Sequence, residues 1–346
     1  MNKKIKCAVI GCGLWGHHHC LVFNEGQYSE LVAVCDKDIS KAKAFGEEFN
    51  VNYYTDAEKM YASEEIDAVG IATPDFGHFE PLISAISHDK HILVEKPIVI
   101  DSEELDKVVD LIEKHKNIRI MVDYHMRYAP YLVVPVNKIH NGDLGSPISV
   151  YMRQNDVIGF ATRAVDWTIS WASKSSVLWF LGSHTVDCVS WIFRDKVKKV
   201  YSIVHDGLLK SKGVNTEDAY YTTLEFEKGG IAQIENGWIT PNGNPNVIDV
   251  KIEVLCSKGL VRLDLSSNNF LQIYTEQRVE NPDFTIFPKY LGQVYGLAFE
   301  SIRDFIRKLY LEEEFLFSFE DSVASNKVLF AIQESSINKV PVFVKY

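Results

Sequence analysis

Short apolar segments alternate with helical patterns along the first third of the chain. Residues 5–10, 31–35, 67–72, 91–94 and 119–122 are compact apolar runs. Residues 78–87 and 102–114 instead have the spacing of helices, with Ser102 expected as the N-cap of the second one. Runs that are apolar at nearly every position are typical of parallel strands buried on both faces. The pattern therefore predicts an α/β domain that ends near residue 123.

The rest of the chain has a different pattern. Short β-rich runs separated by Gly, Asn or charged turns occupy residues 148–153, 197–205, 220–226, 231–238, 250–255 and 260–265. They predict one antiparallel sheet. Residues 293–310 and 319–337 have helical spacing and are expected to close this domain. We predict two domains, residues 1–123 and residues 124–346.

A glycine motif follows the first apolar run. Gly11, Gly13 and Gly16 have the GxGxxG spacing, and Cys12, Leu14 and Trp15 lie between them. In a strand–turn–helix arrangement the first glycine permits the turn, the second admits a pyrophosphate, and the third lets the helix pack against the strand. We predict that these six residues bind a dinucleotide at the helix N-terminus.

Asp36 ends the second apolar run, twenty residues after Gly16. At this distance a carboxylate is expected to accept hydrogen bonds from the ribose hydroxyls of the dinucleotide. It would also repel a 2′-phosphate, so we expect NAD as the cofactor and NADP as the less favoured one. The neighbouring Lys37 weakens this preference, because its charge would accommodate the phosphate.

Two further turns follow apolar runs of the same domain. Loops at the carboxyl ends of parallel strands line the ligand crevice, so residues in these turns are expected to contact the cofactor: Thr73, Pro74, His78, Glu95 and Lys96. Oxidation of a secondary alcohol needs a cation beside the reacting oxygen. We predict that Lys96 supplies it, the alternative being an ordinary surface lysine.

The same reaction needs a group that exchanges the hydroxyl proton. His184 lies early in an apolar helix that runs to about Phe193, and Asp187 and Trp191 follow on the same side. A histidine oriented by a neighbouring carboxylate titrates near neutral pH. We predict that His184 is the second catalytic residue, with a purely structural histidine as the alternative.

Aromatic and cationic residues are concentrated between Phe160 and Phe180: Arg163, Trp167, Trp171, Lys174 and Trp179. Such a mixture suits stacking on a sugar ring and binding of its hydroxyls, although core packing explains aromatic residues equally well. Trp171 and Lys174 are therefore candidate substrate residues, together with Lys96 and His184. No metal is expected, because the six cysteines form no CxxC pair and the consecutive histidines 17–19 point in different directions.

Composition and charge limit the kinds of partner that the chain is expected to bind. The 346 residues carry a net charge of −11 and contain no block of Lys and Arg, which argues against a nucleic-acid partner. Neither a signal peptide nor an apolar run of membrane-spanning length is apparent. A cytoplasmic protein without a membrane partner is the expectation.

Together these motifs resemble those of the Gfo/Idh/MocA oxidoreductases, named for glucose-fructose oxidoreductase and inositol dehydrogenase. The resemblance is carried by the glycine motif, Asp36, Thr73-Pro74 with His78, Glu95-Lys96-Pro97, and Gly-Ser-His-Thr-Val-Asp at residues 182–187. It implies a Rossmann domain and an α+β domain with a large, mainly antiparallel open sheet, which carries the substrate site and commonly forms homodimers or homotetramers. Residues 123–130 match a family segment whose arginine corresponds to Arg127, a candidate for cofactor or substrate contact or for a structural ion pair.

One departure from the family pattern concerns Phe180, which stands where many members have an aspartate. Either Lys96 and His184 suffice, or Asp156 or Asp166 replaces that carboxylate, or the chain binds NAD without ordinary turnover. We expect an NAD(P)-dependent oxidoreductase that acts on a hydroxyl or carbonyl carbon of a sugar, cyclitol or related polyol. The alternatives are an enzyme that retains NAD and performs elimination, epimerisation or hydrolysis through transient oxidation, and a catalytically silent NAD-binding regulatory protein.

Overall fold

The computed structural model describes residues 3–162, 171–266, 271–277, 279–283 and 285–346. It divides into two compact units, each formed by two stretches of the chain. The first unit comprises Met1–His125 and Thr285–Val323, and the second comprises Met126–Phe284 and Ala324–Tyr346. Residues 285–323, far along the chain, thus belong with the N-terminal segment.

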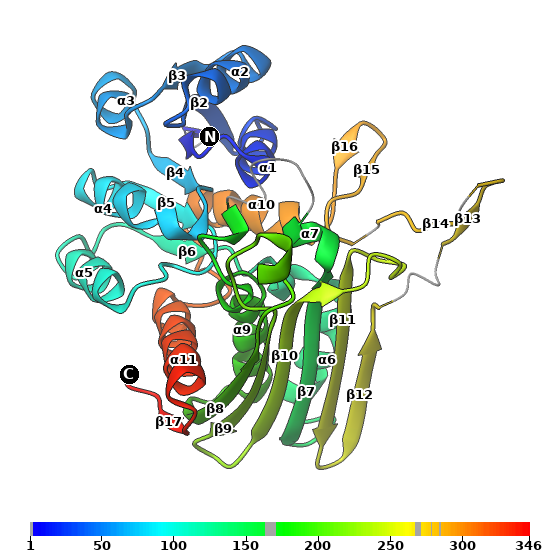
Figure 1. The fold of residues 1–346 in the computed structure, drawn as a ribbon. Coiled ribbons are helices and arrows are strands. Elements are labelled where there is room, and N and C mark those ends of the chain that lie inside the picture. The colour runs from blue at the N-terminus through cyan, green and yellow to red at the C-terminus, as the bar shows by residue number, and fades with distance from the viewer. Residues whose placement is uncertain (1–2, 163–170, 267–270, 278, 284) are drawn as a thin grey trace. The chain divides into compact units, whose positions relative to one another are not determined.

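The first unit contains a six-stranded parallel sheet in the order β3-β2-β1-β4-β5-β6 (Figure 1). Its strands are β1 (Ile5–Ile10), β2 (Ser29–Cys35), β3 (Asn52–Tyr54), β4 (Ala68–Ile71), β5 (His91–Val94) and β6 (Ile120–Val122). The connecting helices are α1 (Leu14–Phe23), α2 (Ile39–Phe49), α3 (Ala57–Ser63), α4 (Phe79–Ser87) and α5 (Ser102–Ile112), with the 3₁₀ turn η1 (Asp75–Gly77) before α4. The central strands are buried, as their apolar runs predict.

The later stretch adds a helix to this unit. Helix α10 (Leu297–Tyr310) packs against α1 and β1, and a short hairpin of β15 (Lys289–Tyr290) and β16 (Gln293–Val294) precedes it. The sequence pattern predicted helix from residue 293. The helix begins later because residues 293–294 pair with the preceding strand and Gly296 adopts a φ of +98°.

The N-cap of α5 also differs from the prediction. Asp101, and not Ser102, caps the helix, since its Oδ1 accepts the backbone N–H groups of Glu103 at 2.9 Å and Glu104 at 3.1 Å. Ser102 is the first helical residue. Both residue types favour caps, so the pattern alone did not separate them.

The second unit is built on a seven-stranded sheet in the order β12-β11-β7-β10-β9-β8-β17. Its strands are β7 (Pro147–Val157), β8 (Val197–His205), β9 (Ala219–Phe226), β10 (Ile231–Thr240), β11 (Ile248–Cys256), β12 (Gly259–Asp264) and β17 (Val342–Phe343). The remaining elements are η2 (His125–Tyr128), α6 (Pro130–His140), α7 (Ile158–Thr162), the π-helix η3 (Leu178–Gly182), α9 (Ser183–Phe193), η4 (Lys210–Lys212), β13 (Ile273–Tyr274), β14 (Val279–Glu280) and α11 (Phe319–Asn338), which begins in the first unit.

This sheet is mainly antiparallel, as expected, but it is not wholly antiparallel as the strand pattern alone predicted. β7 and β10 run parallel, and the other neighbouring pairs are antiparallel. The reason is the connection: the chain leaves β7, passes through η3 and α9 and forms β8 and β9 before β10 returns beside β7. Hydrophobic alternation does not carry that information.

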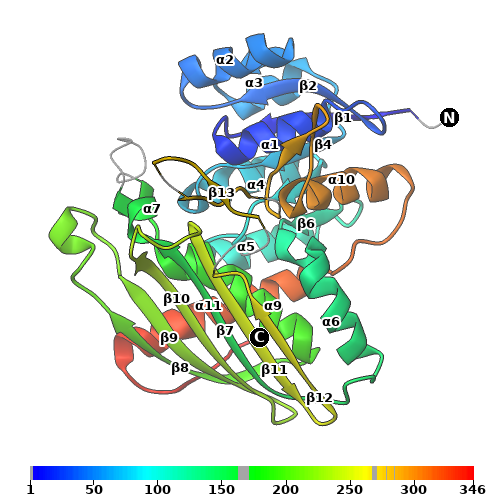
Figure 2. The same cartoon turned by 90° about the vertical axis from the view of Figure 1, so that its right-hand side faces the viewer.

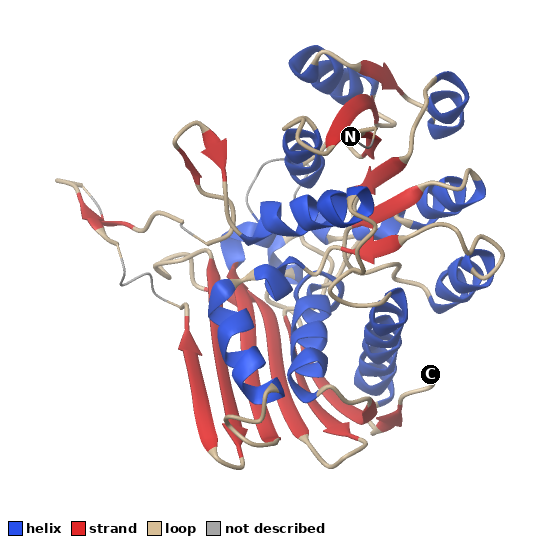
Figure 3. Ribbon diagram, turned by 180° about the vertical axis from the view of Figure 1, so that it is seen from behind, coloured by secondary structure: helices blue, strands red, loops and turns tan. Residues whose placement is uncertain are grey.

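The two faces of the sheet are chemically different. One registered row crosses the strands as Ser202, Thr222, Ile234, Met152 and Ile252, all of them buried. Helices α6, α9 and α11 lie on this side (Figure 3). The adjacent row, made of Ile203, Tyr221, Glu235, Arg153, Lys251 and Asp264, points to the opposite side, over which no described helix lies (Figure 2).

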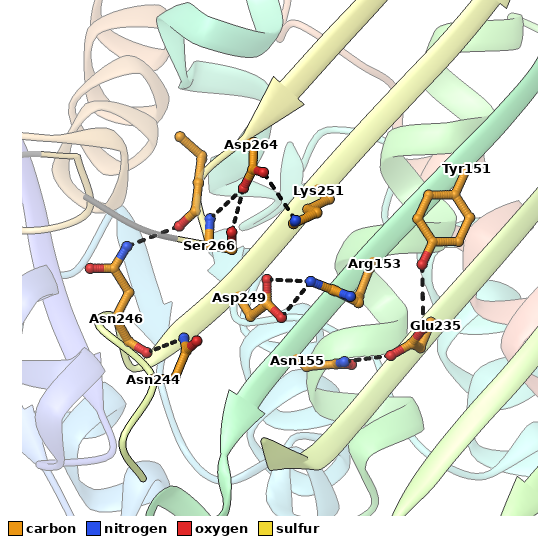
Figure 4. A network of polar contacts seen from close by, with 11 residues as sticks. Tyr151, Arg153, Asn155, Glu235, Asn244, Asn246, Asp249, Lys251, Asp264 and Ser266 are labelled. Carbon is orange, nitrogen blue, oxygen red and sulfur yellow. Dashed lines mark hydrogen bonds and ion pairs between the residues drawn. The ribbon is translucent and has the colours of Figure 1, made fainter. Parts of the chain in front are cut away.

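Polar side chains on this open face bind one another. Arg153 forms an ion pair with Asp249 at 2.7 Å, and Lys251 forms one with Asp264 at 3.0 Å. Asn155 donates a hydrogen bond to Glu235 at 2.6 Å (Figure 4). Tyr201, Ile203 and Tyr221 remain 38%, 55% and 47% exposed among these charges. In the described part of the chain, no helix combines the length and apolar character needed to cross a bilayer.

Candidate active site

The glycine motif forms the turn between β1 and α1. Gly11 has a φ of +101°, and a Cβ there would lie 2.7 Å from the backbone of Ala72 and Thr73. A Cβ on Gly16 would lie 1.8 Å from the carbonyl oxygen of Gly11. Both glycines are therefore required by the close approach of backbone to backbone.

Gly13 differs from its neighbours, because a Cβ there would meet no atom within 4 Å. Gly13 is the N-cap of α1, and no side chain accepts a hydrogen bond from the first N–H groups of the helix as a cap. The first turn also contains no acidic residue. The helix thus offers backbone N–H groups beside open space, which suits a pyrophosphate. Leu14 is 59% exposed and Trp15 is half-buried beside it.

Asp36 follows β2 and is held by two backbone groups. Its Oδ2 accepts the N–H of Cys12 and its Oδ1 accepts the N–H of Asp38, both at 2.8 Å. The carboxylate is thereby fixed beside the glycine turn and remains half-buried. The Cys12 thiol points away, toward the carbonyl of Cys35 at 3.8 Å, and burial raises its pKa well above the usual range.

The turns after β4 and β5 are joined by His78. This residue is buried, and its Nδ1 lies 2.8 Å from the carbonyl oxygen of Pro97 while its Nε2 lies 2.9 Å from that of Thr73. The Thr73 hydroxyl in turn donates to the carbonyl of Gly77 at 3.0 Å. Pro74 is exposed at the same turn. Both ring nitrogens of His78 are thus directed at the backbone of the two turns.

Lys96 and Glu95 leave the end of β5 and are buried, at 6% and 4% exposure. Burial raises the pKa of Glu95 to about 7, although the Lys96 ammonium acts in the opposite direction. His19 of α1 lies with its Nε2 3.2 Å from the Glu95 carboxylate. The first unit therefore carries a buried carboxyl group with a raised pKa directly beside the candidate catalytic lysine.

Sequence reasoning missed three residues of this neighbourhood: His19, Asp123 and His125. Asp123 is wholly buried after β6, and His125 stacks on Trp15 with ring centroids 5.0 Å apart. Burial and the nearby Lys96 charge lower the pKa of His125 to about 3. A signal for His19 was available, since it follows Gly16 by three residues and so shares the helix face that packs on the sheet.

In the second unit, Arg127 forms an ion pair with Asp187. The guanidinium Nη2 lies 2.7 Å from Oδ1 and the Nε lies 2.9 Å from Oδ2, and both residues are buried. The Trp191 ring lies 5.5 Å from the guanidinium carbon. Asp187, which the helical spacing offered as the partner of His184, is directed at Arg127.

His184 is 5% exposed in the first turn of α9, directly after the π-helix η3. The next residue, Thr185, contacts Asn236 of β10 through its hydroxyl at 3.0 Å. This contact ties the start of α9 to the sheet. Lys174 lies exposed before η3.

Phe180 has apolar surroundings in place of the carboxylate site of many relatives. Its ring centroid lies 5.2 Å from Phe160, 4.9 Å from Trp171 and 5.8 Å from Trp238. Trp171 therefore belongs to an aromatic cluster, and Trp179 is buried against Phe330. Asp156 lies buried near the end of β7. Arg163, Asp166 and Trp167 lie outside the described residues.

A parallel sheet in this order, a glycine turn on a free helix N-terminus and a carboxylate after β2 define a dinucleotide-binding Rossmann unit. Comparison with protein families agrees. Residues 5–124 match an oxidoreductase family with an NAD-binding Rossmann fold, and residues 137–262 match the GFO/IDH/MocA C-terminal domain. The chain belongs to the Gfo/Idh/MocA family and is an NAD(P)-dependent dehydrogenase.

The known relatives differ in their activities. The chain is 23% identical to an inositol 2-dehydrogenase of Rubrobacter xylanophilus, over 81% of this chain and 78% of that protein. It is 25% identical to a 2,7-anhydro-N-acetylneuraminate hydratase of Mediterraneibacter gnavus, over 82% and 76%. The fold is that of scyllo-inositol dehydrogenase from Lactobacillus casei, solved with NAD(H) and scyllo-inositol, with a TM-score of 0.83, 20% identity and coverage of 99% of both chains.

The open space at Gly13 gives a test of cofactor binding. Gly13→Ala is expected to keep the folded structure but to weaken NAD binding roughly ten-fold or more, because the methyl group occupies the space of the pyrophosphate. Gly16→Ala is the matched variant. It should lower the free energy of unfolding by about 1–3 kcal/mol or more, since the Gly11 carbonyl must move. Urea unfolding and NAD titration of both variants separate the two effects, and equal NAD affinity in Gly13→Ala and wild type would contradict the assignment.

Asp36 gives a second test, on cofactor choice. Asp36→Asn keeps an oxygen that accepts hydrogen bonds and removes the charge, so the ratio of NADP to NAD affinity is expected to rise roughly ten-fold. Lys37→Ala should change the ratio in the opposite direction. Fluorescence titration with both dinucleotides measures it, and an unchanged ratio in Asp36→Asn would show that the carboxylate does not face the ribose.

Proposed function

We propose that the chain oxidises a secondary hydroxyl group of a sugar, cyclitol or related polyol, or reduces the matching carbonyl, with NAD. The observation that carries this proposal is the position of Lys96. It is buried at the carboxyl edge of the parallel sheet, the edge at which the glycine turn also lies. The inositol 2-dehydrogenase among the relatives supports a cyclitol or sugar as the substrate class.

Each candidate residue has a role that follows from its chemistry. Gly13 and the N-terminus of α1 would hold the pyrophosphate of NAD, and Asp36 its ribose hydroxyls. When bound, the nicotinamide supplies a carbon that accepts or returns a hydride. The Lys96 ammonium donates a hydrogen bond to the reacting oxygen and stabilises its alkoxide character. His184 takes the hydroxyl proton during oxidation and returns it during reduction.

We assign supporting roles to the remaining candidates. Leu14 and Trp15 border the pyrophosphate site, and Thr73, Pro74 and Glu95 belong to the turns around the cofactor. His78 keeps those two turns together through its contacts with Thr73 and Pro97. Trp171, Lys174 and Arg127 remain candidates for the substrate side.

A second function is favoured by two observations. Phe180 brings no carboxylate to the histidine helix, and a hydratase is among the relatives. In such an enzyme NAD stays bound, the substrate is oxidised transiently, and elimination, epimerisation or hydrolysis follows before the hydride returns. This version produces a changed sugar without net formation of NADH.

Turnover with a panel of sugars, inositols and sugar acids tests both versions. With the correct substrate, wild type should form NADH at 340 nm, and Lys96→Ala should reduce kcat about 100-fold or more, a far larger effect than its change in NAD affinity. Lys116→Ala, an exposed lysine of the same unit, is the control and should retain full activity. A changed sugar without NADH supports the NAD-retaining enzyme. NAD binding with no product of either kind would leave the silent regulatory protein as the function.

We also propose that the open face of the seven-stranded sheet joins copies of the chain into a homodimer or homotetramer. Tyrosines among paired charges, such as Arg153 with Asp249, are typical of protein interfaces. Light scattering should give a multiple of 39.4 kDa. Tyr221→Glu, at a 47% exposed position of this face, should lower that mass, and Ile39→Glu, at a 57% exposed position of α2, should not. A monomeric wild type would exclude the proposal.

A further inference from the structure

Three buried titratable side chains of the Rossmann unit form a cluster that includes Glu95, the residue before Lys96. His19 comes from α1, Glu95 from the end of β5 and Asp123 from the end of β6. One nitrogen or carboxylate oxygen of each lies within 4.8 Å of the others. The three residues are 0%, 4% and 0% exposed. Apart from the Ser301 hydroxyl, no described group donates a hydrogen bond to Asp123. Two carboxyl groups thus lie close together with almost no exposed surface.

The charges around this acid pair, Glu95 and Asp123, do not balance two carboxylates. The groups that act on it are His19 from α1, Lys96 after β5 and Ser301 from α10. His125 after β6 lies near Lys96 and His18. Burial lowers the pKa of both His18 and His19 to about 4, so these rings are neutral at pH 7. Lys96 then supplies the one positive charge among the described groups that face the pair.

A buried carboxylate without a counter-charge is costly, and two carboxylates at this separation repel each other. The pair removes both costs by keeping a proton. One carboxyl group is then neutral, and the other stays ionised. The remaining single negative charge matches the single positive charge of Lys96.

We propose that Glu95 and Asp123 hold one shared proton at neutral pH, and that the negative charge left on the pair holds the Lys96 ammonium in its charged form and in place. Asp123 is then a positioning residue. This second part rests on the catalytic role proposed for Lys96. The first part does not, and it can be tested without any substrate.

A divalent cation is the competing occupant, because imidazole and carboxylate groups are also metal ligands. Two features argue for the proton. The Lys96 ammonium lies close enough to act on both carboxyl groups and would repel a second cation. The cluster also has almost no solvent contact, so water could not complete the coordination of a metal ion.

The shared proton has a consequence for stability. Burial and the repulsion by Glu95 raise the pKa of Asp123 to about 8, and burial raises that of Glu95 to about 7. Between the ordinary carboxyl pKa and these values, the folded chain binds more protons than the unfolded chain. The folded state therefore loses stability as pH rises from about 5 to about 8.

Asp123→Asn tests this directly, because the amide has nearly the same shape and no proton to lose. From pH 5 to pH 8 the unfolding equilibrium constant of wild type should increase at least about ten-fold more than that of Asp123→Asn in urea titrations. Asp110→Asn, an exposed carboxyl group of α5, should follow wild type. Parallel curves for wild type and Asp123→Asn would overturn the shared proton.

Infrared spectroscopy and metal analysis separate the proton from a metal ion. A protonated carboxyl stretch should be present at pH 7 in wild type and lost in Asp123→Asn. Protein dialysed against Zn²⁺ or Mn²⁺ should retain no more metal than Asp123→Asn. One bound ion per chain that Asp123→Asn lacks would overturn the proposal in favour of a metal site.

The pH profile of kcat tests the positioning role once a substrate is known. Asp123→Asn removes the second negative charge that forms at high pH, so Lys96 should lose its proton earlier. The alkaline limb is expected to move down by roughly one pH unit with little change in KM. An unchanged profile, together with a confirmed shared proton, would overturn the positioning role alone. The stability and infrared tests could instead find no shared proton while Lys96→Ala abolishes activity. That combination would overturn the proposal and leave the proposed function intact.

Discussion

The contact between the backbone of Gly16 and that of Gly11 is the constraint on which the first unit depends. The carbonyl oxygen of Gly11 lies where the Cβ of any other residue at position 16 would be. Helix α1 can therefore approach β1 this closely only with glycine at position 16. The same approach brings the N-terminus of α1 to the carboxyl edge of the sheet, and it places His19 against the end of β5. The position of the free α1 N-terminus and the environment of the candidate lysine thus both result from one packing distance.

Much of the first unit could be predicted because its signals are local. An apolar run such as residues 91–94 is long enough for one buried strand, and the structure gives the same bounds. The glycine spacing specifies a turn whose geometry few other residues permit. The positions of Asp36 and Lys96 follow from the rule that strand ends of a parallel sheet share one edge.

What the sequence did not reveal depends on contacts between distant segments. The parallel pairing of β7 with β10 results from chain connectivity. The ion pair between Arg127 and Asp187 joins residues sixty positions apart. The acid pair is of the same kind. Asp123 is an ordinary turn residue by its spacing, and only its distance from Glu95 makes it unusual. Periodicity likewise gives no sign that His19 beside it is buried and neutral.

The division of the first unit between two stretches of chain has a consequence for biosynthesis. Residues 285–323 supply α10, which packs on α1 and β1, and His18 lies against Phe299 of that helix at 4.9 Å between ring centroids. While the ribosome is still translating the intervening segment, α1 has no partner for this face. The nucleotide-binding unit therefore reaches its final structure only after residues 285–323 have left the exit tunnel, so the appearance of NAD affinity would report that this stretch has been synthesised.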